Sequence, residues 1–264
     1  MTLVVTADDL GMSAGVTRGI LEAHRDGVVR STSLLVTFPA AEEAAALALA
    51  ERDLEVGLHI DLVGGVPVSD PAEVRSLVDG DGRFRPLGDF TRRLLTGRIR
   101  ADDVAREVRA QVERARSWGV PALAWDSHRH VHLMPPVARV VGRLTRELDA
   151  RWVRRGRGPR QPLGPKSAAI HAASLVSELA YRGMPGNRWF VDLTAARPRL
   201  DATRVALLAA SGGLGELGTH PGYADDELRR SDWLVEDREI DLTILTDPLL
   251  REALGRDCVV WRVH

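Results

Sequence analysis

Acidic and histidine side chains follow four short apolar segments of this sequence, at the point where each segment ends. They are Asp8 and Asp9, His59, Asp126 with His128, and His220. If the segments are neighbouring parallel strands of a barrel, these side chains meet at one rim, because the carboxyl ends of the strands lie on the same side. Carboxylates and imidazoles bind divalent metal ions. The pattern therefore predicts a metal-dependent site.

The segment Asp126-Ser127-His128-Arg129-His130-Val131-His132 gives the sharpest signal. If it stays extended, His128, His130 and His132 share one face, because strand side chains alternate with a period of two. Buried imidazoles need polar partners, so we expect a metal-binding or catalytic role for at least one of the three. Asp126 is expected to orient one of them through a hydrogen bond.

The other polar residues also have ordinary structural explanations. Acids such as Asp8 and Asp9 often cap the helix that follows a strand, and a lone buried histidine such as His59 is commonly hydrogen-bonded within a core. His220 lies in a Thr-His-Pro-Gly sequence that could form a turn; at the same rim it becomes a candidate proton donor. Structural or solvated positions are expected for the remaining histidines, His24, His171 and His264.

Strand-like and helix-like patterns alternate along the chain. Strands are expected at Leu3–Thr6, Ser31–Val36, Glu55–Ile60, Ala122–Trp125, Trp152–Val153, Trp189–Leu193, Gly215–Thr219 and Asp257–Val263. Helices are expected from Ser13 to about Gly27, and at Pro39–Ala50, Ala101–Trp118, Pro135–Ala150, Ser167–Leu179, Asp201–Ser211 and Asp232–Arg251. Repeated β-then-α order predicts one parallel sheet. We therefore predict an α/β fold, a TIM-barrel-related (β/α) barrel that is complete, distorted or reduced to seven strands, in a single domain over residues 1–264.

Two longer loops are expected. Val63–Asp89 is rich in glycine and proline, and such a segment is either a lid or binding loop or simply irregular. Arg154–Lys166 is basic and also rich in glycine and proline. It is either a solvated connection or a rim loop whose arginines meet a polar or anionic substrate.

Composition excludes some classes of partner. The 264 residues carry 36 basic and 37 acidic side chains, and this balance argues against a nucleic acid or a membrane surface. No apolar run approaches the roughly 20 residues that span a bilayer. The single cysteine, Cys258, cannot form an internal disulfide and is expected in the core. A cytoplasmic location is the default expectation.

Six motifs occur in order along nearly the whole chain. They are Thr6-Ala7-Asp8-Asp9-Leu10-Gly11-Met12-Ser13, Gly19-Ile20-Leu21-Glu22-Ala23-His24, Ser31-Thr32-Ser33-Leu34, Val56-Gly57-Leu58-His59, Asp126 to His132, and His220-Pro221-Gly222. Together they resemble the YdjC-like carbohydrate deacetylases, which include the chitooligosaccharide deacetylases. Thr6 and Leu10 replace the usual Asn and Phe, and Arg129 replaces the middle residue of a His-His-His-Val-His run.

The resemblance implies a TIM-barrel-related fold, a homodimer and a small-molecule substrate that is an N-acetylated sugar. It also implies one divalent metal ion held by Asp9, His59 and His128. In this resemblance Asp8 matches the general base and His220 the general acid. Imidazole ligands favour zinc, and the resemblance adds magnesium, so both Zn²⁺ and Mg²⁺ are expected candidates.

This ligand set suits amide hydrolysis, because one carboxylate and two imidazoles leave positions for water and for the acetyl oxygen. The expected reaction releases acetate and a free amine. Asp126, His130 and His132 are expected to support the ligands or to contact the substrate. One alternative is a phosphoesterase-like barrel hydrolase that binds a second metal through His130 and His132. Another is a sugar-binding relative without catalysis.

Overall fold

A computed structural model describes residues 2–157, 165–196, 203–205, 207, 213–254, 258–259 and 261. Most of the expected helix Asp201–Ser211, part of the basic loop (residues 158–164), the side chain of Cys258 and all of His264 lie outside the described part.

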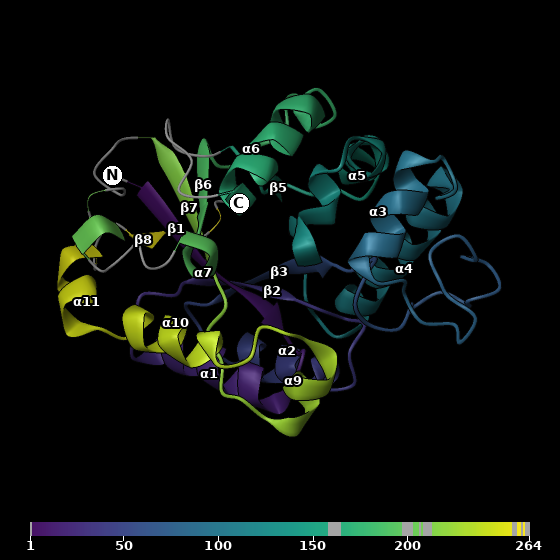
Figure 1. Ribbon diagram of the computed structural model, residues 1–264. Helices are drawn as coiled ribbons and strands as arrows, with labels where there is room; N and C mark the ends of the chain where they lie inside the picture. Colours follow the sequence, from purple (N-terminus) through teal and green to yellow (C-terminus); the bar gives the residue numbers. More distant parts are fainter. Residues whose placement is uncertain are drawn as a thin grey trace.

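One parallel sheet organises the molecule (Figure 1). Its strands are β1 (Thr2–Leu10), β2 (Ser31–Leu34), β3 (Glu55–Ile60), β4 (Ala124–Ser127), β5 (Trp152–Val153), β6 (Trp189–Asp192), β7 (Leu214–Thr219) and β8 (Cys258–Val259). The order is β5-β4-β3-β2-β1-β7-β6, and β8 pairs with the start of β1. Among the described residues no ladder joins β5 to β6, so the seven-stranded path stays open. The predicted TIM-barrel-related fold is confirmed in its distorted, seven-stranded form.

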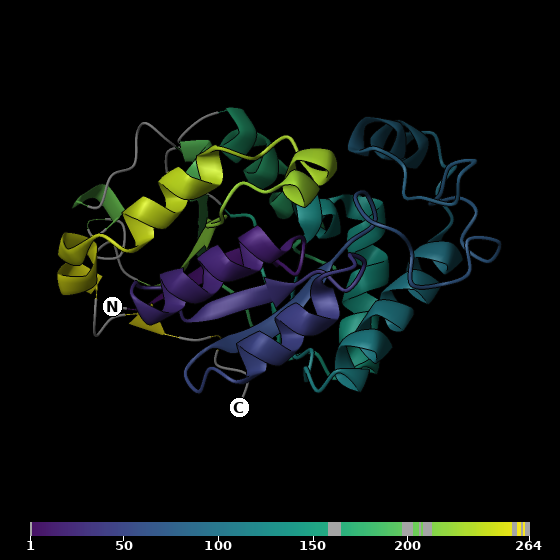
Figure 2. The same cartoon turned by 90° about the horizontal axis from the view of Figure 1, so that it is seen from below.

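Helices cover the outside of this curled sheet. They are α1 (Ala14–Arg25), α2 (Ala41–Leu49), α3 (Leu87–Leu95), α4 (Ala101–Ser117), the 3₁₀ helix η1 (His128–Leu133), α5 (Pro135–Glu147), α6 (Pro165–Ser177), α7 (Leu193–Ala196), α9 (Asp226–Ser231), α10 (Asp237–Leu245) and α11 (Pro248–Leu254). Figure 2 shows α1 and α2 side by side on one outer face. Ser13 caps α1, as predicted: its Oγ accepts the Val16 N–H at 3.2 Å.

The apolar stripe of α4 explains why this segment is helical and which side it buries. Val104, Val108, Val112 and Ala115 recur at helical spacing, and each is at most 2% exposed. A stripe with this period can face the core only from a helix, because strand side chains alternate. The sequence prediction for this element is confirmed.

The predicted helix Asp232–Arg251 is wrong at both its beginning and its middle. Asp232 to Glu236 form an irregular bend, and helical structure begins again only at Asp237. The helical segment is then divided into α10 and α11 just before Pro248. Proline lacks an N–H and suits the first turn of a new helix, which explains the division.

The expected extended conformation after β4 is also wrong. His128–Leu133 form η1, and Arg129 and His130 both have φ of 56°. Two successive left-handed residues turn the chain sharply, so the three histidines of this segment do not share one face. Ser127 stabilises the turn, because its Oγ accepts the His132 N–H at 3.0 Å.

The insertion between β3 and α4 is ordered against its neighbours. Several of its apolar side chains, such as Phe84, are buried in the main core. The Glu107 carboxylate of α4 accepts the N–H groups of Val68 and Ser69 at 2.9 and 3.0 Å. Helix α3 already begins at Leu87, inside the expected loop. The insertion is therefore fixed to α4, and whether it contacts a substrate stays a prediction.

Candidate functional site

Asp8 and Asp9 lie at a local irregularity of β1. The register between β1 and β2 shifts between Ala7 and Leu10, and Asp9 has a φ of 70°. A regular strand would send adjacent side chains to opposite faces. Here both carboxylates line one pocket, because the irregularity changes the direction of the second. A non-glycine residue at positive φ costs energy, and such strain is typical of functional sites.

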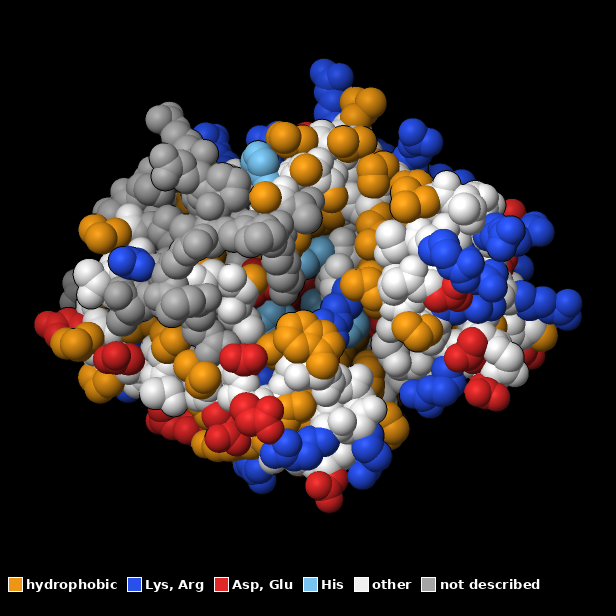
Figure 3. Space-filling model, viewed as in Figure 1, with side chains coloured by type: hydrophobic (Ala, Val, Ile, Leu, Met, Phe, Trp, Pro, Cys, Tyr) orange, Lys and Arg blue, Asp and Glu red, His pale blue; other side chains and the backbone are white. Residues whose placement is uncertain are grey.

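The pocket lies at the carboxyl ends of the strands and has a volume of about 150 Å³. Figure 3 shows histidine side chains at the bottom of a hollow in this face of the molecule. The lining includes most of the residues that the sequence singled out: Asp8, Asp9, His59, His128, His130 and His220. The rim location predicted from the strand ends is therefore the location in the structure.

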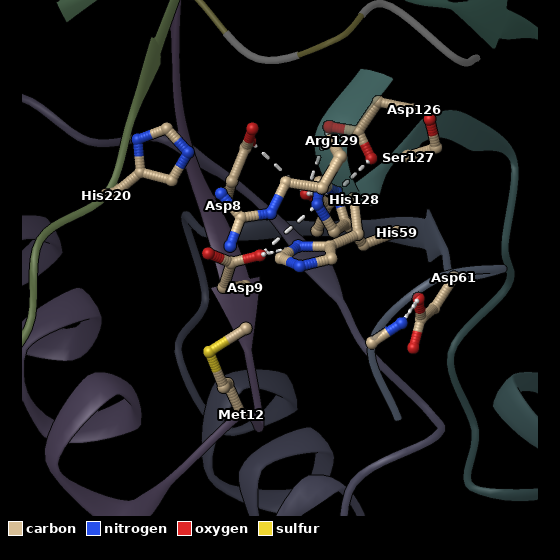
Figure 4. Close-up of polar contacts among 12 residues, drawn as sticks. Asp8, Asp9, Met12, His59, Asp61, Asp126, Ser127, His128, Arg129 and His220 are labelled. Atoms are coloured by element: carbon tan, nitrogen blue, oxygen red, sulfur yellow. Dashed lines mark hydrogen bonds and ion pairs between the residues drawn. The ribbon is translucent and has the colours of Figure 1, made fainter. Parts of the chain in front are cut away.

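Three of these side chains converge from three different strand ends (Figure 4). One ligand atom each from Asp9, His59 and His128 lies within 4.8 Å of the other two. Oδ1 of Asp9 is 2.9 Å from Nδ1 of His128 and 3.3 Å from Nε2 of His59. One carboxylate and two imidazoles at this separation form a donor set that suits a single divalent cation.

Neighbouring side chains bind those atoms of Asp9 and His59 that point away from the point of convergence. Arg238 donates to Oδ2 of Asp9 at 2.7 Å, and Nδ1 of His59 donates to Asp126 at 2.7 Å. Ser33 donates to the second oxygen of Asp126 at 3.0 Å. Oδ1 of Asp9 and Nε2 of His59 therefore face each other, in the carboxylate–histidine arrangement that orients metal ligands.

The surrounding charges favour a cation at this point. Burial opposes a charge on His59, but Asp126 and Asp9 outweigh it and raise the pKa of His59 to about 10. Burial also opposes ionisation of Asp9, yet Arg238 and His128 hold the pKa of Asp9 well below its usual value. A site that keeps its carboxylate ionised and stabilises positive charge at an imidazole fits a bound metal ion.

Asp8 points to a different partner. Arg154 donates to both of its carboxylate oxygens, at 2.6 and 2.8 Å. Burial nevertheless raises the pKa of Asp8 to about 6, because the attraction of Arg154 is opposed by the nearby charge of Asp126. A carboxylate whose pKa lies this close to neutrality can accept a proton more readily than an ordinary aspartate.

Arg154 is the centre of a buried charge cluster. It is 0% exposed and also pairs with Asp126 at 2.8 Å and with Glu216 at 3.0 Å. The prediction of a solvated connection from residue 154 onward is therefore wrong for this residue, which cannot meet bulk solvent. Its guanidinium compensates three carboxylates, so it positions Asp8 from behind the pocket.

His220 follows β7 and lies across Asp8 from the three converging residues (Figure 4). Its Nδ1 is 3.1 Å from Oγ1 of Thr194, and Thr194 in turn donates to Asp241 at 2.7 Å. The backbone N–H of His220 also donates to Asp241 at 2.9 Å. These contacts hold the histidine in place, so its other ring nitrogen, Nε2, can take part in proton transfer in the pocket.

The other two histidines of η1 lie in separate places. His130 lines the pocket, with Nε2 3.8 Å from Asp192 and its ring edge-on to Phe190. His132 is fully buried behind the pocket, where its Nε2 donates to the Arg154 carbonyl at 3.0 Å. This contact with Arg154 is consistent with the predicted supporting role of His132. The burial of His132 is not consistent with the alternative prediction, a direct contact with the substrate.

The burial of His132 predicts a loss of stability in acid. Burial lowers the pKa of His132 from 6.5 to about 3. Between these values the unfolded chain binds a proton that the folded chain does not, so stability falls as the pH is lowered. In urea unfolding at pH 7 and pH 4.5, His132→Gln should lose less stability on acidification than the wild type. Equal losses in both proteins would contradict this assignment.

Sequence reasoning missed Asp192, Glu216 and Arg238, and it gave Arg154 no role inside the protein. Asp192 ends β6 and Arg154 follows β5 directly, so the strand-end rule that found Asp8 applies to both. Glu216 lies inside a buried parallel strand, where a charge is unusual. Arg238 lies on α10 and gives no local signal, because only the fold brings it to Asp9.

Comparisons with known proteins agree with the fold and with the family resemblance of the sequence. A family model described as YdjC-like protein matches residues 2–256. Proteins named carbohydrate deacetylase are similar over most of the chain. One from Brevibacillus brevis is 33% identical over 96% of this chain and 94% of its own length, and one from Geobacillus stearothermophilus is 36% identical over 94% and 90%.

A solved structure has the same overall fold. The crystal structure of a proposed cellobiose-phosphate cleavage protein from Enterococcus faecalis V583 superposes with a TM-score of 0.83 and 25% sequence identity. The match covers 99% of this chain and 97% of that one. The overall fold of this chain is therefore also found in an experimental structure.

Proposed function

The chain belongs to the YdjC-like protein family, and we propose that it is a metal-dependent hydrolase that removes N-acetyl groups from an acetylated amino sugar or oligosaccharide. The products are acetate and a free amine. The observation that carries the proposal is the convergence of Asp9, His59 and His128 in a pocket that Asp8 and His220 also line. Relatives named carbohydrate deacetylase support the substrate class.

The proposal assigns metal binding to Asp9, His59 and His128. A divalent ion held there would polarise the acetyl carbonyl and make water a better nucleophile at neutral pH. The protein's own contribution is to keep Asp9 ionised and to orient His59, through Arg238 and Asp126 respectively. Because these two contacts use Oδ2 of Asp9 and Nδ1 of His59, they leave Oδ1 and Nε2 to bind the metal ion.

Asp8 is assigned the role of general base. Its carboxylate takes the proton of the attacking water as the water oxygen bonds to the acetyl carbon. Arg154 holds both oxygens of Asp8, so the carboxylate cannot rotate away from the pocket. A fixed base needs no reorganisation during the proton transfer, and this lowers the barrier.

His220 is assigned the role of general acid. It donates a proton to the sugar nitrogen as the C–N bond breaks, because an unprotonated amine is a poor leaving group. Thr194 contacts the ring nitrogen Nδ1 and is itself held by Asp241, so the two residues orient the ring. Base and acid thus act from different elements, β1 and the end of β7, on the same pocket.

The choice between Mg²⁺ and Zn²⁺, the homodimer and the cytoplasmic location stay predictions. The same holds for contacts of His130 with the substrate. Among the helices that the structure describes, none combines the length and apolar character that crossing a membrane requires.

An acetate-release assay tests the proposal. The purified protein is incubated with N-acetylglucosamine and its β-1,4-linked oligomers, with glucosamine oligomers as the blank. We expect acetate release that a chelator removes and that added Zn²⁺ or Mg²⁺ restores. The proposal would be contradicted if the metal-loaded protein released no acetate from any of these N-acetylated sugars. It would also be contradicted if the chelator left the rate of acetate release unchanged.

The phosphoesterase alternative finds less support in the geometry. A second candidate group does exist, formed by Asp8, His59 and Asp126. However, the Arg154 guanidinium already pairs with both of its carboxylates, so a cation is present there without a second metal. Neither His130 nor His132 joins a candidate group in the described part of the chain. Two-metal enzymes hold their ions about 3.5–4 Å apart, so metal stoichiometry distinguishes the two functions.

The non-catalytic alternative is also testable with the same protein. Asp8, His59, His128 and His220 are all present and all line the pocket, and this argues for turnover. Binding of an N-acetylated sugar without any release of acetate would favour a sugar-binding protein instead.

A further inference from the structure

An exposed tryptophan stands at the rim of the catalytic pocket. Trp233 is 70% exposed, although its indole is among the largest apolar side chains. Single exposed apolar residues are common and need no function. Trp233 differs from the ordinary case because it lines both the catalytic pocket and a second hollow beside it.

The turn that carries Trp233 is fixed rather than loose. Asp232 accepts hydrogen bonds from Arg129, from Arg238 at 3.1 Å and from the Leu234 N–H at 3.2 Å. Arg238 also donates to the Leu234 carbonyl at 2.9 Å. The Arg129 guanidinium lies over the indole, 5.2 Å from the ring centroid. The indole is therefore held ready to bind while it remains exposed.

The second hollow connects the pocket to the insertion between β3 and α4. It has a volume of about 430 Å³, compared with about 150 Å³ for the catalytic pocket. His128, Arg129 and Trp233 line both spaces, so the two are neighbours. The far wall is formed by insertion residues, among them Arg83 and Phe84. A ligand that extends from the catalytic pocket into the second hollow would therefore lie beside residues that include the indole.

We propose that Trp233 is a platform for a second sugar ring, so that the substrate is an oligosaccharide whose acetylated ring enters the catalytic pocket and whose next ring lies in the second hollow. This inference rests on the proposed deacetylase function. A pyranose ring suits the place because its C–H face is apolar and can stack on an indole, while its hydroxyl groups at the edge can bond to charged side chains.

The test compares one-ring and two-ring substrates. We measure kcat/KM for N-acetylglucosamine and for its β-1,4-linked disaccharide with the metal-loaded wild type, Trp233→Ala and Trp233→Phe. Leu179→Ala is the matched control, because Leu179 is 76% exposed and lines neither hollow. Calorimetry with both sugars measures binding separately from turnover, and unfolding in urea shows that each variant is folded.

The wild type should have a higher kcat/KM for the disaccharide than for the monosaccharide. Trp233→Ala should reduce the ratio of the two values about 10-fold, mainly through KM, because one face of the second ring loses its apolar contact. Trp233→Phe should keep most of the preference and Leu179→Ala all of it. An unchanged preference in Trp233→Ala would overturn the platform while leaving the deacetylase proposal intact. If neither the wild type nor any variant releases acetate, the proposed function fails, and calorimetry alone tests the platform. The platform is then overturned if the ratio of the affinities for the disaccharide and the monosaccharide is the same in Trp233→Ala as in the wild type. It is also overturned if neither sugar binds.

Discussion

Replacing Asp8 by Asn is expected to lower kcat for acetate release by about 10²–10⁴-fold, the usual contribution of a general base, with the metal content still near one ion per chain. The amide has the shape of the carboxylate but cannot take a proton from water. Arg154 keeps two of its carboxylate partners, Asp126 and Glu216, so the buried cluster is not left with an uncompensated positive charge. Steady-state kinetics and elemental analysis of the same sample measure both quantities.

Asp103→Asn is the matched control for this variant. Asp103 is also a buried carboxylate, but it lies on α4 and accepts the Ser76 N–H at 2.9 Å, away from the pocket. Its replacement should leave kcat unchanged. Unchanged activity in Asp8→Asn would remove Asp8 from catalysis, whereas loss of the metal in that variant would place Asp8 among the ligands.

Replacing His128 by Ala is expected to abolish stable metal binding and acetate release together. Replacing a residue that only supports a ligand typically costs about 10–100-fold in metal affinity, so the loss of a ligand should cost more than about 100-fold. His128 suits the test because, within the described part of the chain, the hydrogen bond of its ring goes to Asp9, another proposed ligand. Titration of the metal-free protein with Zn²⁺ gives the affinity.

His24→Ala provides the comparison for a buried histidine outside the pocket. Its Nδ1 lies 2.9 Å from the Val29 carbonyl on the far side of α1, and it contributes to neither candidate metal group. This variant should lose stability but keep the wild-type metal affinity. If His128→Ala bound zinc as tightly as His24→Ala does, the assigned ligand set would be incorrect.

The fold and the position of the site follow from features that short segments carry. The apolar composition of segments such as Val56–His59 predicts strands, and parallel strands necessarily bring their carboxyl ends together. This rule places Asp8, Asp9 and His59 at one rim without any knowledge of the fold's details. It also explains why His220, far away in the sequence, lines the same pocket.

The rest depends on geometry that no local pattern specifies. The sharp turn at Arg129 and His130 reverses the expectation from alternation, because hydrogen bonds to Ser127 favour a turn over an extended chain. The basic, glycine- and proline-rich segment from Arg154 predicts either a solvated connection or a rim loop that faces a substrate, and neither alternative puts its first guanidinium in a buried cluster. Only the sheet places it among three carboxylates. Arg238 reaches Asp9 from a helix 229 residues away.

The most direct test of the account is a crystal structure of the zinc-loaded protein with data recorded at the zinc absorption edge. One anomalous peak is expected per chain, within bonding distance of Asp9, His59 and His128, with Arg154 still paired to Asp8. A peak elsewhere, or a second peak of equal height between Asp8 and Asp126, would contradict it.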